Sequence, residues 1–104
     1  YFSNKNITLL LGVLQDKPYE NMLRQLLPHV KRVVLTEPNS NRKLSIGELE
    51  HTIRQQSSVP IFKDNRIKHA FEIAMKLTDP NDLLCCAGSL YLIGEIKTIL
   101  NKRG

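Results

Sequence analysis

The stretch L-L-C-C-A-G-S-L-Y-L-I-G-E-I, residues 83–96, decides the fold class of this chain. An apolar run stops at Gly88-Ser89, and an amphipathic helical pattern starts at once. The pattern predicts a strand, a tight turn and a helix N-terminus. Such a junction directs backbone N–H groups and the positive end of the helix dipole toward solvent, where they hold a carboxylate or phosphate. Gly88 permits the turn. Ser89 either caps the helix or binds an anion, and the pattern leaves both roles open.

Three further apolar runs, each followed by a helical pattern, precede this segment. The expected strands are residues 7–14, 32–36, 59–62 and 83–87. The expected helices lie between residues 18 and 28 and in residues 45–53, 67–77 and 92–100. Four β-α units in series imply a mostly parallel sheet with helices on both faces. We therefore predict an α/β, Rossmann-like three-layer domain. The glycine-rich nucleotide-binding motifs of such folds are absent from the sequence.

Size and charge exclude several classes of protein. The chain has 104 residues, which suits a single domain, residues 1–104, with its own hydrophobic core. Its net charge is +5, but the basic residues are scattered and not interleaved with aromatics, so we expect no nucleic-acid partner. No apolar run approaches the about 20 residues of a membrane span. Tyr1 is not an initiator methionine and no signal-peptide pattern follows, so we expect a piece of a longer cytoplasmic protein. The sequence does not specify an oligomeric state.

Cysteine and histidine spacing argues against a disulfide or a metal site. Cys85 and Cys86 are adjacent in a predicted strand, which directs neighbouring side chains to opposite faces, so we interpret them as buried small hydrophobes. The histidines have neither an i, i+4 partner nor a C-x-x-C companion. They are His29, His51 and His69, which we expect at the surface or in packing roles.

A capping box and three aromatic residues give two further expectations about the structure. Ser45-x-x-Glu48 is a capping box that predicts the start of a helix. The aromatic residues Tyr19, Phe62 and Phe71 are expected in the core.

Candidate site residues follow the predicted strands, because ligands of open parallel sheets bind beyond the carboxyl ends of the strands. Lys17 could hold a phosphate, and Asp16 could orient that phosphate or a metal-bound water. Arg42 ends the loop T-E-P-N-S-N and suits a two-point grip on a carboxylate. Each of these residues also fits an ordinary surface role, and Glu37 is ambiguous in the same way.

Three segments together resemble one enzyme family. They are G-V-L-Q-D-K-P-Y-E-N-M-L (residues 12–23), V-V-L-T-E-P-N-S-N-R (33–42) and A-G-S-L-Y-L-I-G-E-I (87–96). They resemble the C-terminal domain of folylpolyglutamate synthases, which are ATP-dependent Mur-type ligases and in bacteria often act as dihydrofolate synthases as well. The resemblance runs from about Ile7 to Leu100.

The resemblance implies amide bond formation in folate biosynthesis and one-carbon metabolism. In such ligases ATP phosphorylates a folate or dihydropteroate carboxylate, and the amine of L-glutamate then displaces phosphate. Mg²⁺ bridges phosphate oxygens. ATP and Mg²⁺ are thus expected cofactors of the full-length enzyme, held largely by an N-terminal domain, and we expect neither to bind this chain alone.

The same resemblance suggests roles for individual residues. Ser89, with Gly88, matches a position associated with the incoming glutamate. Arg42 matches the arginine that ends the loop, with a glutamate-binding or loop-ordering role. Asp16 and Lys17 match a pair near the nucleotide and the interdomain cleft. No catalytic residue and no metal ligand is assigned to this chain.

The chain also departs from the family pattern. The D-G-A-H-N-P motif on the family's opening strand does not occur in this sequence, so we expect the first β-α unit of the family's domain to be missing from this chain. We therefore expect no ligase activity from the isolated chain. The alternatives are a stand-alone α/β module that binds a small anionic ligand and an interaction domain without a ligand.

Overall fold

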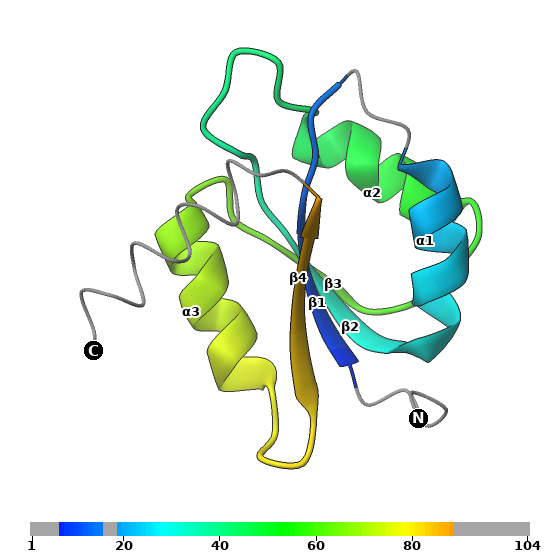
Figure 1. Ribbon diagram of the computed structural model, residues 1–104, viewed down its shortest axis with the longest axis vertical. Coiled ribbons are helices and arrows are strands. Elements are labelled where there is room, and N and C mark those ends of the chain that lie inside the picture. Colours follow the sequence, from blue (N-terminus) through cyan, green and yellow to red (C-terminus); the bar gives the residue numbers. More distant parts are fainter. Residues whose placement is uncertain (1–6, 16–18, 89–104) are drawn as a thin grey trace.

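Four parallel strands form the sheet, in the order β3-β2-β1-β4 (Figure 1). The computed structural model describes residues 7–15 and 19–88. The strands are β1 (Ile7–Gly12), β2 (Val30–Leu35), β3 (Ile61–Lys63) and β4 (Leu83–Gly88). All three pairings are parallel. The predicted α/β class is therefore confirmed.

Helices cover both faces of this sheet. They are α1 (Glu20–Leu26), the 3-10 turn η1 (Leu27–His29), α2 (Ile46–Arg54) and α3 (Ile67–Leu77). Figure 1 shows α1 and α2 on one side of the strands and α3 on the other. The three-layer arrangement is thus the predicted one. The predicted helix at residues 92–100 lies outside the described residues.

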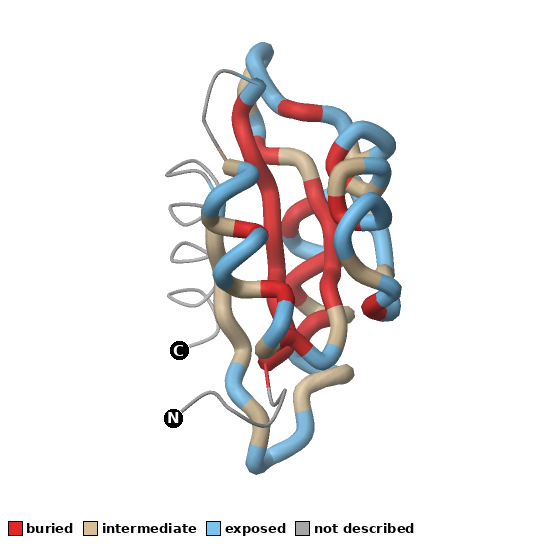
Figure 2. The backbone as a smooth tube through the Cα atoms, turned by 90° about the vertical axis from the view of Figure 1, so that its right-hand side faces the viewer, coloured by how far each residue is buried: buried red, intermediate tan, exposed pale blue. Residues whose placement is uncertain are grey.

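The sheet has a separate hydrophobic core on each face. Leu9 and Leu11 of β1 pack in the cluster that includes Leu23 of α1 and Leu49 of α2. Leu10, between them, packs against α3 in a second cluster. Figure 2 shows the buried residues concentrated along the central strands, between the outer layers. Because successive side chains of a strand alternate between faces, an apolar run such as β1 becomes buried on both sides.

The outer strands are less buried than the centre, and this overturns one prediction. Phe62, expected in the core, is 39% exposed because it lies on the three-residue edge strand β3. Leu83, at the start of β4, is 52% exposed. Cys85 and Cys86 do project into opposite clusters, but at the other edge they are only half-buried. This partial burial raises the pKa of both thiols above the ordinary value.

Strand limits differ from the sequence expectation by up to two residues. β1 ends at Gly12, although Val13 and Leu14 remain buried, because Leu14 forms an antiparallel bridge with Lys43 instead. β3 begins only after Pro60, which has no N–H to donate to a ladder. The capping box is confirmed, since Ser45 Oγ accepts a hydrogen bond from the Glu48 N–H at 3.2 Å. No helix in residues 7–15 and 19–88 could cross a membrane.

Candidate functional site

The carboxyl ends of all four strands lie along one edge of the sheet, where α/β folds bind ligands. On the β4 side of this edge, Gly12 pairs with Gly88. Gly88 has φ +121°, and a Cβ there would overlap the Gly12 carbonyl. A Cβ on Gly12 would lie 3.3 Å from Pro38 Cδ and Thr36 Cγ2. Gly12 therefore lets the chain after β2 pack directly on the end of β1, and Gly88 lets the end of β4 lie against Gly12.

Residues 36–45, the β2–α2 loop, are tied to the segment that follows β1. The Gln15 N–H donates to the Arg42 carbonyl at 2.7 Å, and the Leu44 N–H donates to the Val13 carbonyl at 2.8 Å. The Gln15 side-chain amide adds a hydrogen bond to the Lys43 carbonyl at 3.2 Å. These bonds hold the second half of the loop in one backbone conformation.

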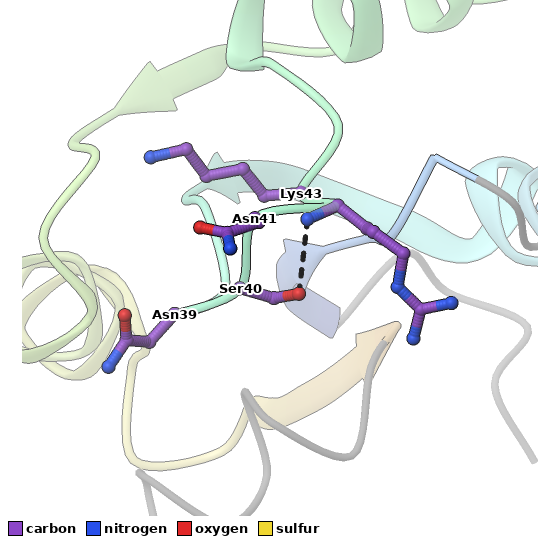
Figure 3. Close-up of a pocket in the computed structure, with 5 residues that line it drawn as sticks. Asn39, Ser40, Asn41 and Lys43 are labelled. Atoms are coloured by element: carbon purple, nitrogen blue, oxygen red, sulfur yellow. Dashed lines mark hydrogen bonds between the residues drawn. The ribbon is translucent and has the colours of Figure 1, made fainter.

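The first half of the loop is a tight turn around Ser40. The Ser40 N–H donates to the Pro38 carbonyl at 2.8 Å, and the Lys43 N–H donates to the Ser40 carbonyl at 3.2 Å. Ser40 Oγ accepts from the Arg42 N–H at 3.2 Å, the dashed line in Figure 3. The turn borders an open hollow lined by residues 39–43 (Figure 3). Two of its five lining residues are cationic, so the hollow suits an anionic ligand.

Glu37 joins this loop to α2. Its Oε2 accepts a hydrogen bond from the Ile46 N–H at 3.1 Å, and its Oε1 lies 3.4 Å from Lys43 Nζ. The Glu37 side chain is only 16% exposed. Sequence reasoning left Glu37 ambiguous. The available signal was a carboxylate placed shortly before a predicted helix start, where the helix dipole favours negative charge.

A second polar group follows β3, in one of the loops that the strand-end rule selects from the sequence, although no site residue was predicted there. Asp64 Oδ1 accepts hydrogen bonds from the Arg66 N–H at 2.9 Å and from Arg66 Nε at 3.3 Å. His69 Nδ1 lies 3.8 Å from Asp64 Oδ2. The backbone hydrogen bond from Arg66, then its guanidinium, lowers the pKa of Asp64. An aspartate two residues before a helix-starting arginine is a familiar turn pattern that could have found this contact.

Thr36 lies directly after β2 and is the first residue of the loop. It is fully buried, and its N–H donates to the Leu11 carbonyl at 2.9 Å. Its hydroxyl has no hydrogen-bond partner among the described residues.

With the fold and this edge described, comparison with known proteins becomes informative. A family described as "Mur ligase, glutamate ligase domain" matches residues 1–90. The chain belongs to this family. No curated protein matches the chain significantly by sequence.

Solved structures share the fold of this Mur ligase domain. A Mycobacterium tuberculosis folylpolyglutamate synthase, complexed with ADP and AMPPCP, has TM-score 0.80 and 23% identity over 92% of this chain. The Thermotoga maritima folylpolyglutamate synthase has TM-score 0.76 and 23% identity over 96%. A bifunctional folylpolyglutamate synthase/dihydrofolate synthase from Yersinia pestis, complexed with AMPPNP and Mn ion, has TM-score 0.77 and 20% identity over 92%. This chain covers only 24%, 22% and 22% of those chains, respectively.

Two of the five predicted site residues of this Mur ligase domain fall in the described structure. Gly88 ends β4 and Arg42 lies exposed in the β2–α2 loop, so both lie at the carboxyl edge. Asp16, Lys17 and Ser89 lie outside the described residues. Within residues 7–15 and 19–88, no three His, Cys, Asp or Glu side chains are grouped to hold a metal ion.

Proposed function

We propose that this chain is the amino-acid-binding part of an ATP-dependent ligase that adds L-glutamate to folates. The observation that carries the proposal is the ordered β2–α2 loop, which presents Arg42 at the ligand-binding edge of a Mur ligase glutamate ligase domain. The three structural neighbours described above are folylpolyglutamate synthases, and the Yersinia pestis enzyme is also a dihydrofolate synthase. Their names support the substrate class.

In this proposal the chain binds and orients L-glutamate. The guanidinium of Arg42 grips one carboxylate through two parallel hydrogen bonds. The turn at Gly88, with Ser89 after it, receives a second carboxylate, where the sequence predicts the N-terminus of a helix. Holding both carboxylates would aim the glutamate amine at an activated folate carboxyl group held elsewhere in the enzyme.

ATP and a divalent cation belong to the same proposal. Two of the neighbours were solved with nucleotides, and one of them with manganese as well. ATP would supply the phosphoryl group that activates the folate carboxylate, and the cation would neutralise phosphate charge. Asp16 and Lys17 are proposed to lie near the nucleotide.

The test uses the protein expressed from the complete reading frame. The measurement is ATP-dependent transfer of radiolabelled L-glutamate to tetrahydrofolate, with dihydropteroate assayed separately for dihydrofolate synthase activity. We expect transfer to tetrahydrofolate, and none from the 104-residue chain assayed alone. Absence of transfer to either acceptor would reject the ligase and leave the small anion-binding module as the function to pursue.

The Arg42→Ala substitution tests the proposed glutamate contact. Loss of a charge-assisted contact worth about 2 kcal/mol should raise the KM for L-glutamate about 30-fold while the KM for ATP stays within twofold. Arg24→Ala is the matched control, because Arg24 is an exposed arginine of α1 whose side chain bonds, within the described part of the chain, to Asn21 at 2.9 Å. Equal effects of the two substitutions would exclude Arg42 from the glutamate site.

A further inference from the structure

The β2–α2 loop is tethered at both ends by different means. Its second half is held by backbone hydrogen bonds from Gln15 and Leu44 to the partners described above. Its first half starts with the backbone hydrogen bond from the Thr36 N–H to the Leu11 carbonyl of β1, and its other described backbone bonds are the short-range ones around Ser40. The contact that ties this first half to α2 is the carboxylate of Glu37.

We propose that Glu37 is a positioning residue that fixes the amino-acid-binding loop against the N-terminus of α2. The inference rests on the proposed function, which it deepens by naming what sets the loop's shape. Glu37 does not touch the amino acid. It acts through the backbone that presents Arg42 and through the side chain of Lys43.

The chemistry of the α2 N-terminus explains why a carboxylate is needed at this place. The first N–H groups of a helix have no partner within the helix. Ser45 satisfies one of them, the Glu48 N–H. Glu37 satisfies another, the Ile46 N–H, from nine residues earlier. A half-buried carboxylate at the positive end of a helix dipole makes a stronger bond than a neutral acceptor would.

The ion pair with Lys43 gives Glu37 a second role. Lys43 is half exposed, and its ammonium lies 3.4 Å from Glu37 Oε1. Glu37 therefore partly neutralises one of the two cations that line the hollow. Removing the Glu37 carboxylate would both loosen the loop and change its charge, and two different substitutions separate these effects. Glu37→Ala removes both contacts, whereas Glu37→Gln keeps a carbonyl acceptor for the Ile46 N–H and loses only the ion pair.

The first experiment measures amide hydrogen exchange by NMR on this 104-residue chain. We expect Glu37→Ala to increase exchange of the Ile46 amide about tenfold, because its acceptor is lost. The Leu44 amide, bonded to the Val13 carbonyl, should change less than twofold. Glu37→Gln should leave the Ile46 amide protected. The matched control is Glu50→Ala, since Glu50 is a glutamate on α2 itself that pairs with Lys63 at 3.0 Å, away from the loop.

The second experiment titrates the same variants with L-glutamate and follows the amides of residues 39–43. We expect Glu37→Ala to weaken binding about tenfold, Glu37→Gln to change it by about threefold or less, and Glu50→Ala to leave it unchanged. In the complete enzyme, Glu37→Ala should raise the KM for L-glutamate about tenfold with kcat within twofold. A merely structural defect would instead lower kcat through loss of folded enzyme, at unchanged KM.

The outcomes separate this inference from the proposed function. Unchanged Ile46 exchange in Glu37→Ala overturns the positioning role, whatever the ligand does. Unchanged affinity for L-glutamate despite faster Ile46 exchange also overturns it, because the tether would then not matter for the ligand. The proposed function fails if residues 39–43 of the unmodified chain show no response to L-glutamate and the complete enzyme shows no activity. In that case the exchange result still decides whether Glu37 holds the loop.

Discussion

At position 88, both the backbone conformation and the packing require a residue without a side chain. The Gly88 φ of +121° disfavours any side chain, and a Cβ would overlap the carbonyl of Gly12 on the neighbouring strand. Gly47, in the first turn of α2, is the opposite case, with nothing within 4 Å of an added Cβ. The two glycines are therefore a matched pair for testing the packed edge of the site.

At this scale we predict that Gly88→Ala lowers the free energy of unfolding by about 3 kcal/mol, from the sum of backbone strain and overpacking. Gly47→Ala should instead raise it by about 0.5–1 kcal/mol, because alanine favours a helix over the unfolded chain. Urea unfolding followed by circular dichroism measures both. A Gly88→Ala chain as stable as the unmodified one would show that β4 does not end against Gly12 as described.

At the scale of elements, the N-terminus of α2 is stabilised by one local contact and one contact from a distant residue. Ser45 caps the helix from the adjacent position, while Glu37 reaches Ile46 from the preceding loop. The apolar face of α2 is set by spacing, since Leu49 and Ile53 are buried and four residues apart. Sequence reasoning found the cap and the face, because both depend on residues within one or two turns.

The hydrogen bond from the Ser45 cap predicts a measurable loss of stability when its side chain is removed. Ser45→Ala leaves the Glu48 N–H without its acceptor and should lower the free energy of unfolding by about 1 kcal/mol. Ser58→Ala, at an exposed serine outside the helices, is the control and should change it by less than about 0.3 kcal/mol. Thermal unfolding of the three proteins side by side gives the comparison. Equal midpoints would mean that water replaces the cap without cost.

At the scale of the whole molecule, Arg32 joins the sheet to the chain that connects α3 with β4. Its guanidinium donates to Thr8 Oγ1 on β1 at 3.1 Å and to the Leu77 carbonyl at the end of α3. It also lies 3.8 Å from the Asp82 carboxylate, and both side chains are largely buried. This network lies on the α3 face, toward the amino ends of the strands and away from the candidate site.

We predict that Arg32→Met lowers the free energy of unfolding by about 2–3 kcal/mol, since it leaves a buried hydroxyl and a carbonyl without their donor. Asp79→Asn, which removes an exposed pair with Lys31 at 3.3 Å, should cost less than about 0.5 kcal/mol. Urea titration of both variants tests the contrast. A small effect of Arg32→Met would indicate that the α3–β4 connection repacks without this arginine.

The amino-acid sequence by itself determined the order of the elements, the parallel sheet and the covered faces. Apolar spacing over a few residues decides these features, which is why the limits of α3, residues 67–77, agree with the expectation. The sequence also placed Arg42 and Gly88 at one edge of the sheet, because the carboxyl ends of all the parallel strands lie along that edge.

Only the tertiary structure decided which strands are central and which polar groups meet. Phe62 is apolar and in a strand, yet it is exposed because β3 lies at the sheet edge. The bridge between Leu14 and Lys43, and the reach of Glu37 to Ile46, join parts of the chain that no local pattern connects. Such contacts depend on how whole elements pack, and burial and pairing are properties of that packing rather than of any short segment.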